Sequence, residues 1–225
     1  MAYETGPGAN GPGRNRPGGT RPEANGPRGS APGTTRVRAA AALVLGWVAL
    51  LWVLEFADTA SGHALDTYGI TPRDPAELRD IVPAAFLHFG FDHLAANTVP
   101  LLLLGFIAAI SGIRRFLAVT AVIILASGLG VWLFAPGNSL TAGASGVVFG
   151  LFGYLLVRGF ADRRPLYVIV GLVVAFFYGS MLWGVLPTAS GVSWQGHLFG
   201  LLGGVLAAFL FRTRRGPAPV EGLRR

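Results

Sequence analysis

Long apolar runs are the feature that most constrains the fold of this chain. A helix needs about twenty predominantly apolar residues to cross the hydrocarbon core of a bilayer. Only 13% of the residues are charged, compared with about 25% in an average soluble domain. We therefore predict an all-α polytopic membrane protein with six transmembrane helices, the fourth of them short. The predicted spans are about 37–56, 92–111, 116–134, 144–157, 165–186 and 194–211.

The basic residues predict the orientation of these spans. All 18 of them are arginine, the net charge is +7, and they flank the apolar runs, which favours a lipid bilayer over nucleic acid as the partner. They precede the first span and follow the second, fourth and sixth, whereas the opposite connections are acidic (57–92) or uncharged (135–143 and 187–193). The positive-inside rule then places both termini in the cytoplasm, and we expect a multi-pass protein of a bacterial inner membrane.

Composition divides the chain into three parts. Residues 1–36 are Gly, Pro, Asn, Thr and Arg with few apolar side chains, so we expect a disordered cytoplasmic tail. Residues 37–212 form the expected six-helix domain, and residues 213–225 form a short basic tail.

The acidic connection contains a helix-start signature. Asp74, Pro75 and Glu77 occupy the N-cap, N1 and N3 positions, which predicts a short helix from this point. Its apolar side chains Leu78, Ile81 and Val82 share one face, as in a helix that lies at the membrane interface. We expect Pro83 to end the helix.

Two polar residues inside apolar spans are the candidate catalytic groups. Ser145 opens the fourth span and His197 lies near the start of the sixth. Polar side chains are costly at membrane depth and therefore suggest function. A serine hydroxyl needs a base to become a nucleophile, and histidine is a suitable base near neutral pH. The predicted orientation places both residues near the extracytoplasmic face.

Carboxylates do not complete a triad in this prediction. Spans two to six contain no Asp or Glu away from their ends, so we predict a Ser–His dyad. Glu55 and Asp58 end the first span and are interpreted as interfacial or loop-packing groups. His63, in the outer loop, has no evident partner, and we expect it to be solvated.

Stabilisation of an oxyanion needs hydrogen-bond donors beside the serine. His93 and Asn97 are four residues apart and share one face of the second span. The Asn97 amide and the His93 ring are candidate donors. The backbone N–H of Ser145, at a helix N-terminus, is a third.

Glycine spacing provides a reason for the fourth and sixth spans to meet. Gly146 and Gly150, and Gly200 and Gly204, both form G-x-x-x-G, a spacing that allows helix backbones to approach closely. Gly200 and Gly204 share a helix face with His197, so this packing would bring the histidine toward Ser145.

Each signal has a simpler interpretation when it is taken alone. A serine in a membrane helix often bonds only to its own backbone, and G-x-x-x-G indicates helix packing. A membrane histidine can also serve a transporter as a proton relay. We find no internal repeat of the kind common in transporters, and the combination of signals at one depth favours hydrolysis.

The residues together resemble the rhomboid family of intramembrane serine proteases, over about residues 40–212. The family's G-x-S-G motif corresponds to residues from Gly143 to Gly146. Its H-x-x-x-N motif corresponds to His93–Asn97, and its H-x-x-G-x-x-x-G motif to His197–Gly204. His88 also matches a family histidine that helps to organise the first loop.

The resemblance implies Ser145 as nucleophile, His197 as general base, and Asn97, His93 and the Ser145 amide as the oxyanion hole. It implies transmembrane-protein substrates that are cut near the membrane surface, and no metal or cofactor. The chain departs from the family where Arg79 and Asp80 replace a common Trp-Arg pair, so we expect the loop anchoring to differ. Phe149 replaces a tyrosine that stacks on the catalytic histidine, and we expect activity to be kept. The alternative is a rhomboid-like pseudoprotease, which binds membrane proteins without cutting them; such proteins typically lack the serine or the histidine.

Overall fold

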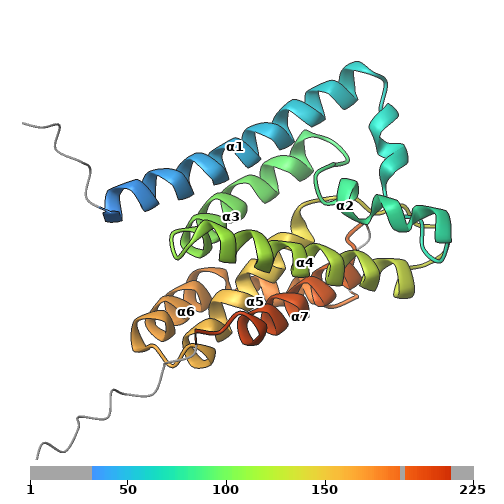
Figure 1. The fold of residues 1–225 in the computed structure, drawn as a ribbon. Coiled ribbons are helices and arrows are strands. Elements are labelled where there is room, and N and C mark those ends of the chain that lie inside the picture. The colour runs from blue at the N-terminus through green and yellow to red at the C-terminus, as the bar shows by residue number, and fades with distance from the viewer. Residues whose placement is uncertain (1–31, 188–190, 214–225) are drawn as a thin grey trace, which may run out of the picture. The chain divides into compact units, whose positions relative to one another are not determined.

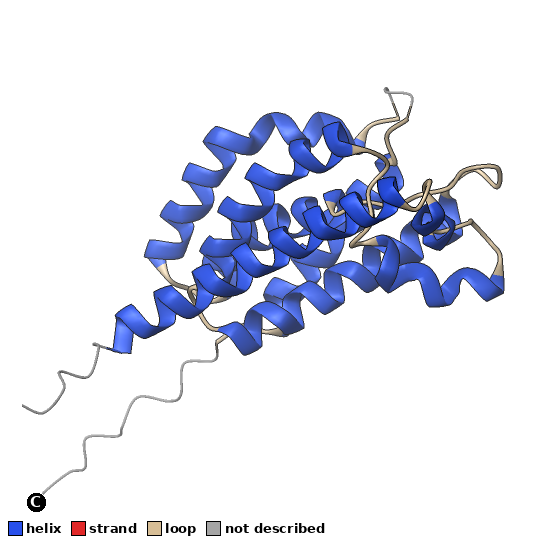
Figure 2. Ribbon diagram, turned by 90° about the horizontal axis from the view of Figure 1, so that it is seen from above, coloured by secondary structure: helices blue, strands red, loops and turns tan. Residues whose placement is uncertain are grey.

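A computed structural model describes residues 32–187 and 191–213, which form a bundle of helices (Figures 1 and 2). These residues contain no β-strand, and the one pairing of β type among them is an isolated antiparallel bridge between Ile70 and Thr141. The elements in chain order are α1 (Pro32–Ala60), η1 (Ala64–Tyr68), η2 (Pro75–Asp80), α2 (Ile81–Ala84), α3 (Phe91–Ala109), α4 (Ile113–Phe134), α5 (Ser145–Ala161), α6 (Pro165–Tyr178), η3 (Gly179–Val185) and α7 (Trp194–Leu210), where η marks a 3-10 helix.

Each of the six predicted spans corresponds to a helix of the structure. Four helical segments are long and apolar enough to cross a membrane, namely 33–60, 91–109, 113–134 and 165–185, whereas α5 and α7 are shorter. α1 begins at Pro32, so residues 32–36 of the expected tail are helical. The expected tails otherwise fall on residues 1–31 and 214–225, which lie outside the described residues.

The central helix of the bundle is α5. It packs against α3, α4, α6 and α7, and 12 of its 17 residues are buried. By contrast, α6 lies at the edge of the bundle, where only Gly171 and Val174 are buried along its length. The phenylalanine rings of Phe176 and Phe177 are exposed, as expected for side chains that face lipid.

Glycines bring α5 and α7 into backbone contact, as their spacing predicts. A Cβ at Gly200 would collide with the carbonyl of Gly146, and a Cβ at Gly204 would collide with the carbonyl of Gly150. A Cβ at Gly150 would come within 2.8 Å of the Gly200 carbonyl oxygen. The two helices therefore approach too closely for any larger residue at these positions.

The first loop, residues 61–90 between α1 and α3, is fastened to the last turn of α4 and to the connection that follows it. Ile70 exchanges two backbone hydrogen bonds with Thr141, of 2.8 and 3.1 Å. The Arg73 guanidinium donates to the Ala135 carbonyl at 2.9 Å, and the Trp132 indole donates to the Asp74 carbonyl at 2.7 Å. These contacts anchor the loop in this chain, in which Arg79 and Asp80 stand at the positions of the Trp-Arg pair.

The helix start at Asp74 is confirmed, but its predicted end is wrong. The Asp74 carboxylate accepts a hydrogen bond from the Ala76 N–H at 2.9 Å, and η2 then continues directly into α2. Pro83 lies inside α2, which ends at Ala84. A proline is tolerated in the first turn of a helix because its missing N–H has no intrahelical partner there.

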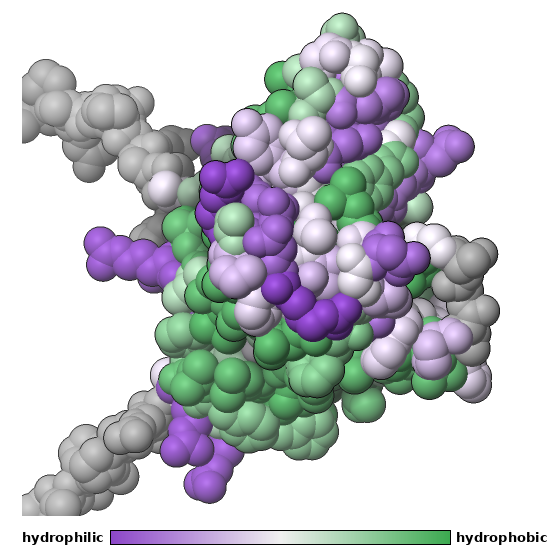
Figure 3. Space-filling view, turned by 90° about the vertical axis from the view of Figure 1, so that its right-hand side faces the viewer, coloured by the Kyte–Doolittle hydropathy of each residue, from purple (hydrophilic) through white to green (hydrophobic). Residues whose placement is uncertain are grey.

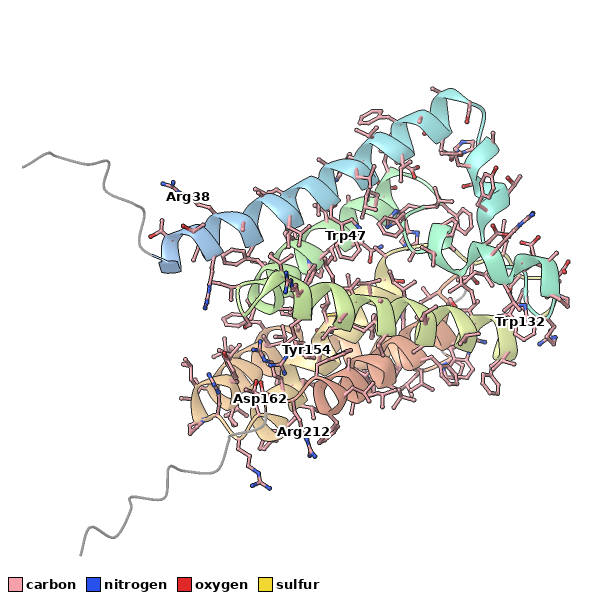
Figure 4. All side chains as sticks on the ribbon, viewed as in Figure 1. Arg38, Trp47, Trp132, Tyr154, Asp162 and Arg212 are labelled. Carbon is pink, nitrogen blue, oxygen red and sulfur yellow. The ribbon has the colours of Figure 1, made fainter. Side chains whose placement is uncertain are left out.

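The bundle has two chemically different ends. Figure 4 places Arg38, Asp162 and Arg212 toward one end and Trp132 toward the other. Figure 3 looks onto the end that carries the loops, where hydrophilic side chains gather above a hydrophobic flank.

Arg158 follows the fourth predicted span, and we interpreted it as a flanking charge. It is in fact 3% exposed and hydrogen-bonded to Asp162 and Ser111. It is buried because these partners and the ring of Tyr167, 4.0 Å from its guanidinium carbon, surround it.

Candidate active site

Ser145 and His197 lie within hydrogen-bond distance, although 52 residues separate them in the chain. Ser145 is the first residue of α5 and His197 lies in the first turn of α7. The close approach of these two helices brings the Ser145 Oγ to 3.0 Å from the His197 Nε2. The predicted nucleophile and its predicted base are therefore side by side.

The other ring nitrogen of His197 is held by the backbone. Its Nδ1 lies 2.9 Å from the carbonyl oxygen of Gly184, in η3. A carbonyl oxygen can only accept, so Nδ1 must carry the proton and Nε2 must be the acceptor for the Ser145 hydroxyl. In a Ser–His–Asp triad a carboxylate performs this orienting role; here a neutral carbonyl does so.

An aromatic ring fixes the plane of the histidine. The Phe149 ring stacks on the His197 ring with centroids 4.0 Å apart and an angle of 8° between the planes. Phe149 lies one helical turn after Ser145 on α5. Stacking, which we expected to survive the replacement of tyrosine by phenylalanine, is present.

A cavity of about 720 Å³ opens above the pair. Its lining includes Ser145, His197, His93 and Asn97, so all four predicted polar groups reach one space. The Asn97 Nδ2 donates one hydrogen bond to the His93 carbonyl at 3.0 Å. An amide nitrogen carries two hydrogens, so a second donor remains on Asn97.

Gly143 and Ala144 fix the backbone that leads into Ser145. Gly143 has φ +139°, a conformation that side chains disfavour, and an added Cβ would lie 2.7 Å from the His93 ring. Its N–H donates to the Ala84 carbonyl at 2.8 Å. This glycine therefore allows both the turn and the approach of His93.

His88 connects the first loop to the same segment. Its Nε2 accepts a hydrogen bond from the Ala144 N–H at 3.2 Å, so its Nδ1 carries the proton. Burial and the neighbouring His93 lower the pKa of His88 to about 4, which keeps the ring neutral near pH 7. The loop role inferred for this residue is consistent with the contact.

The sequence did not reveal two further groups that help to position His197. The Gly184 carbonyl orients His197, and the Ser127 hydroxyl donates to the Gly196 carbonyl at 2.9 Å, which joins α4 to α7 one residue before the histidine. A backbone carbonyl has no signature in a sequence, and a serine in an apolar helix resembles a packing residue. Only the fold identifies them.

The polar residues at the end of α1 lie outside the cavity. Glu55 and Asp58 are each 2% exposed, and Asp58 accepts a hydrogen bond from the Leu65 N–H at 2.7 Å, which fits the loop-packing interpretation. His63 is exposed, but the expectation that it lacks a partner is wrong. Its Nδ1 donates to the Asp58 carboxylate at 2.9 Å, because the turn after α1 folds the ring back toward the helix end.

The fold and this geometry define a helical membrane protein with a buried serine–histidine pair beside a cavity. The model of the Rhomboid domain matches residues 75–214, and the chain belongs to the rhomboid family. Membership supports, at the level of the family, an intramembrane protease of the serine hydrolase type that acts in the membrane.

Three relatives illustrate the range of similarity. An uncharacterised protein of Mycobacterium tuberculosis, Rv1337, is 43% identical over 175 residues, which are 74% of this chain and 73% of the relative. The putative rhomboid protease YdcA of Bacillus subtilis is 27% identical over 78% of this chain and 89% of its own length. The rhomboid protease GluP of Bacillus subtilis is 32% identical over 54% of this chain and 24% of its own length.

Proposed function

We propose that this protein is an active intramembrane serine endopeptidase with a Ser145–His197 dyad. The observation that carries the proposal is the 3.0 Å contact between the Ser145 Oγ and the His197 Nε2, with the other nitrogen held by the Gly184 carbonyl. This is the arrangement that a nucleophile and its oriented base require. A pseudoprotease has no need of such a contact.

In the proposed reaction, His197 takes the Ser145 proton as the oxygen attacks the carbonyl carbon of the substrate. The resulting imidazolium then gives this proton to the departing amine, and the acyl group stays on Ser145. A water molecule, deprotonated by the same Nε2, hydrolyses the ester and restores the serine. Each proton that His197 accepts is returned within the same half-reaction.

The oxyanion is stabilised by donors that converge on the cavity. Ser145 begins α5, so its backbone N–H has no partner within the helix. The free hydrogen of the Asn97 amide and the ring of His93 line the same cavity. Donors fixed in advance favour the transition state because they need little reorganisation during the reaction.

The lengths of the helices support a site below the membrane surface. We infer six transmembrane helices with both termini and the arginine-rich end in the cytoplasm. α5 and α7 have 17 residues each, which corresponds to about 25 Å, whereas the hydrocarbon core is about 30 Å thick. If the C-terminal ends of both helices lie at the cytoplasmic boundary, their N-termini lie within the bilayer, near its extracytoplasmic face.

A site at this depth favours transmembrane segments as substrates. We propose that the protein acts on them in a bacterial inner membrane. Within a bilayer, an unwound backbone is tolerated only where protein or water satisfies its polar groups. The cavity offers such a place, because it is lined by His93, Asn97 and Ser193 as well as by the dyad. Segments that unwind easily are therefore the expected substrates, and the family resemblance implies small residues at the cut.

Cleavage of a model substrate tests the proposal. Purified wild type and Ser145→Ala are incubated in detergent with a panel of single-span membrane proteins, and the products are identified by mass spectrometry. We expect wild type to cut within or beside the span and Ser145→Ala to leave the substrate intact. Equal cleavage by both would contradict the role of Ser145, and binding without any cleavage by wild type would instead identify a pseudoprotease.

A further inference from the structure

A second cluster of ionisable side chains lies outside the cavity, between the end of α1 and η1. Figure 1 shows this end of α1. The cluster consists of Asp58, His63 and Asp66, which we call the outer cluster. The His63 Nδ1 is 2.9 Å from a carboxylate oxygen of Asp58 and 3.8 Å from one of Asp66. One ligand atom from each of the three residues lies within 4.8 Å of the other two.

The backbone holds the outer cluster in place. Asp58 organises the turn, since its main-chain carbonyl accepts from the His63 N–H at 2.9 Å and its side chain accepts from the Leu65 N–H at 2.7 Å. His63 has φ +65°, a left-handed conformation that is uncommon for residues other than glycine. This conformation allows the ring to reach the carboxylates, and so the three side chains converge before any ligand binds.

A third carboxylate, that of Glu55, supplies an independent reason to expect a cation. Glu55 lies one helical turn before Asp58 on α1 and is 2% exposed. The Gly90 backbone lies beside its carboxylate, but neither oxygen accepts a hydrogen bond within 3.5 Å among the described residues. This carboxylate is close enough to Asp58, Asp66 and His63 to interact with them electrostatically. A buried carboxylate without a partner is costly, and this one lies beside two others.

Nearby positive charge does not compensate for these carboxylates. Within residues 32–187 and 191–213, no arginine forms an ion pair with Glu55, Asp58 or Asp66. The Oδ1 atom of Asp66 is likewise buried without a hydrogen-bond partner. A bound cation would supply the charge partner that these carboxylates lack.

We propose that the outer cluster binds a divalent transition-metal ion, with Asp58, His63 and Asp66 as ligands and Glu55 as a nearby countercharge. An imidazole nitrogen combined with carboxylate oxygens suits Zn²⁺, whereas Ca²⁺ prefers oxygen ligands alone. Tetrahedral Zn²⁺ with bonds of about 2.1 Å separates its ligand atoms by about 3.4 Å, so the distances in the outer cluster need only small adjustments.

The bound ion would join the end of α1 to the first loop. That loop is hydrogen-bonded to the segment before α5 through Ile70 and Thr141. The ion would therefore stabilise the position of the first loop over the N-terminal end of α5. None of the cluster residues lines the cavity. Metal binding is therefore separable from catalysis, and the inference stands or falls independently of the proposed protease activity.

Binding of Zn²⁺ by the purified full-length protein tests the proposal. After metal removal with a chelator, Zn²⁺ affinity is measured by competition with a fluorescent zinc indicator, and thermal unfolding is followed with and without Zn²⁺. The variants are His63→Asn and Asp66→Asn, since asparagine tolerates a left-handed backbone and is isosteric with aspartate. Asp92→Asn, at an exposed acid in the first turn of α3, is the matched control.

We expect wild type and Asp92→Asn to bind one Zn²⁺ per chain and to unfold at a higher temperature when it is present. His63→Asn and Asp66→Asn should each bind about tenfold more weakly or worse, and Ca²⁺ should not reproduce the thermal shift. Absence of binding by wild type would overturn the proposal. Undiminished binding by His63→Asn would also overturn it, because the ion would then be held by other histidines.

Discussion

The two ends of α5 solve the problem of a buried polar group in opposite ways. At its start, Ser145 contacts the His197 ring of α7, and the Gly184 carbonyl orients that ring. At its end, Asp162 accepts two hydrogen bonds from the Arg115 guanidinium, at 2.9 and 3.1 Å, and one from Arg158 at 3.3 Å. One end carries the proposed dyad, which contains no carboxylate or guanidinium, and the other carries a network of Asp162 with two arginines.

This difference suggests that the Ser145 end of α5 serves the proposed reaction and that the Asp162 end serves the stability of the fold. In the proposed reaction His197 accepts and returns a proton. A charge beside the ring would alter its affinity for that proton, whereas a carbonyl orients the ring without adding a charge. At the opposite end, no proton has to move, and Asp162 can bind three segments of the chain at once. Its contacts with α4, with α5 and with the Thr213 N–H at 2.7 Å fasten the helix ends together.

The largest expected effect belongs to the Ser145 end. His197→Ala should lower kcat by about 10⁴-fold or more, because the nucleophile loses its base. The thermal unfolding temperature should change little, since the ring borders a cavity. Cleavage rates of a single-span substrate and unfolding curves measure the two quantities. A variant that loses stability in proportion to activity would mean that His197 is chiefly structural.

The Asp162 end should show the reverse pattern. Asp162→Ala leaves the buried Arg158 without its carboxylate, which should cost about 3–5 kcal/mol of unfolding free energy. The folded fraction should retain its kcat. Asp92→Ala, which removes an exposed acid, is the control and should change stability by about 0.5 kcal/mol. The comparison fails if Asp162→Ala abolishes catalysis in protein that is still folded.

Acid should weaken the two ends over different pH ranges. His88 has a pKa of about 4 in the folded protein and about 6.5 in the unfolded chain. The unfolded chain therefore binds more protons between these values, so stability should decrease by about 3 kcal/mol as pH falls from 6.5 to 4. Unfolding temperatures over this range should fall less in His88→Gln, and an identical dependence in the variant would contradict the assignment.

Asp162 should respond only at lower pH. Burial raises the pKa of its carboxyl, but the hydrogen bonds from Arg115 and from the Thr213 N–H outweigh this and hold it below the usual value. The group's contribution to stability is therefore present above the ordinary aspartate pKa and is lost as pH falls through the folded value. The same titration in Asp162→Asn should lack this second, more acidic decrease.

The smallest effect concerns the carbonyl that orients His197. A Cβ at Gly184 would lie 2.7 Å from the Phe149 ring and 3.3 Å from the His197 Nδ1. Gly184→Ala should therefore tilt the histidine and lower kcat about tenfold, or about 1.4 kcal/mol of barrier. Gly179→Ala is the matched control, because a Cβ there meets nothing within 4 Å. Equal rates for both variants would remove the orienting role from Gly184.

Periodic and chemical patterns in the sequence predicted much of this molecule. Apolar runs gave the helices, and glycine spacing predicted that α5 and α7 touch at Gly146 and Gly200. The four polar residues around the cavity could be named because each is costly in an apolar helix. These features depend on side-chain type alone.

What the sequence did not predict depends on how the backbone folds back on itself. The Gly184 carbonyl is a partner of His197 only because η3 bends toward α7, and the contact of His63 with Asp58 needs a left-handed turn. Arg158 was interpreted as a flanking charge because its burial depends on Ser111, 47 residues earlier in the chain, as well as on Asp162, four residues later. Tertiary contacts of this kind have no periodic signature.

Covalent labelling of the serine tests the central claim most directly. Purified wild type, Ser145→Ala and His197→Ala are treated in detergent with a fluorophosphonate, and the modified peptide is located by mass spectrometry. The account predicts an adduct on Ser145 in wild type, none in Ser145→Ala, and a strongly reduced yield in His197→Ala. An unmodified Ser145 in folded wild type, or equal labelling without His197, would contradict a catalytic dyad.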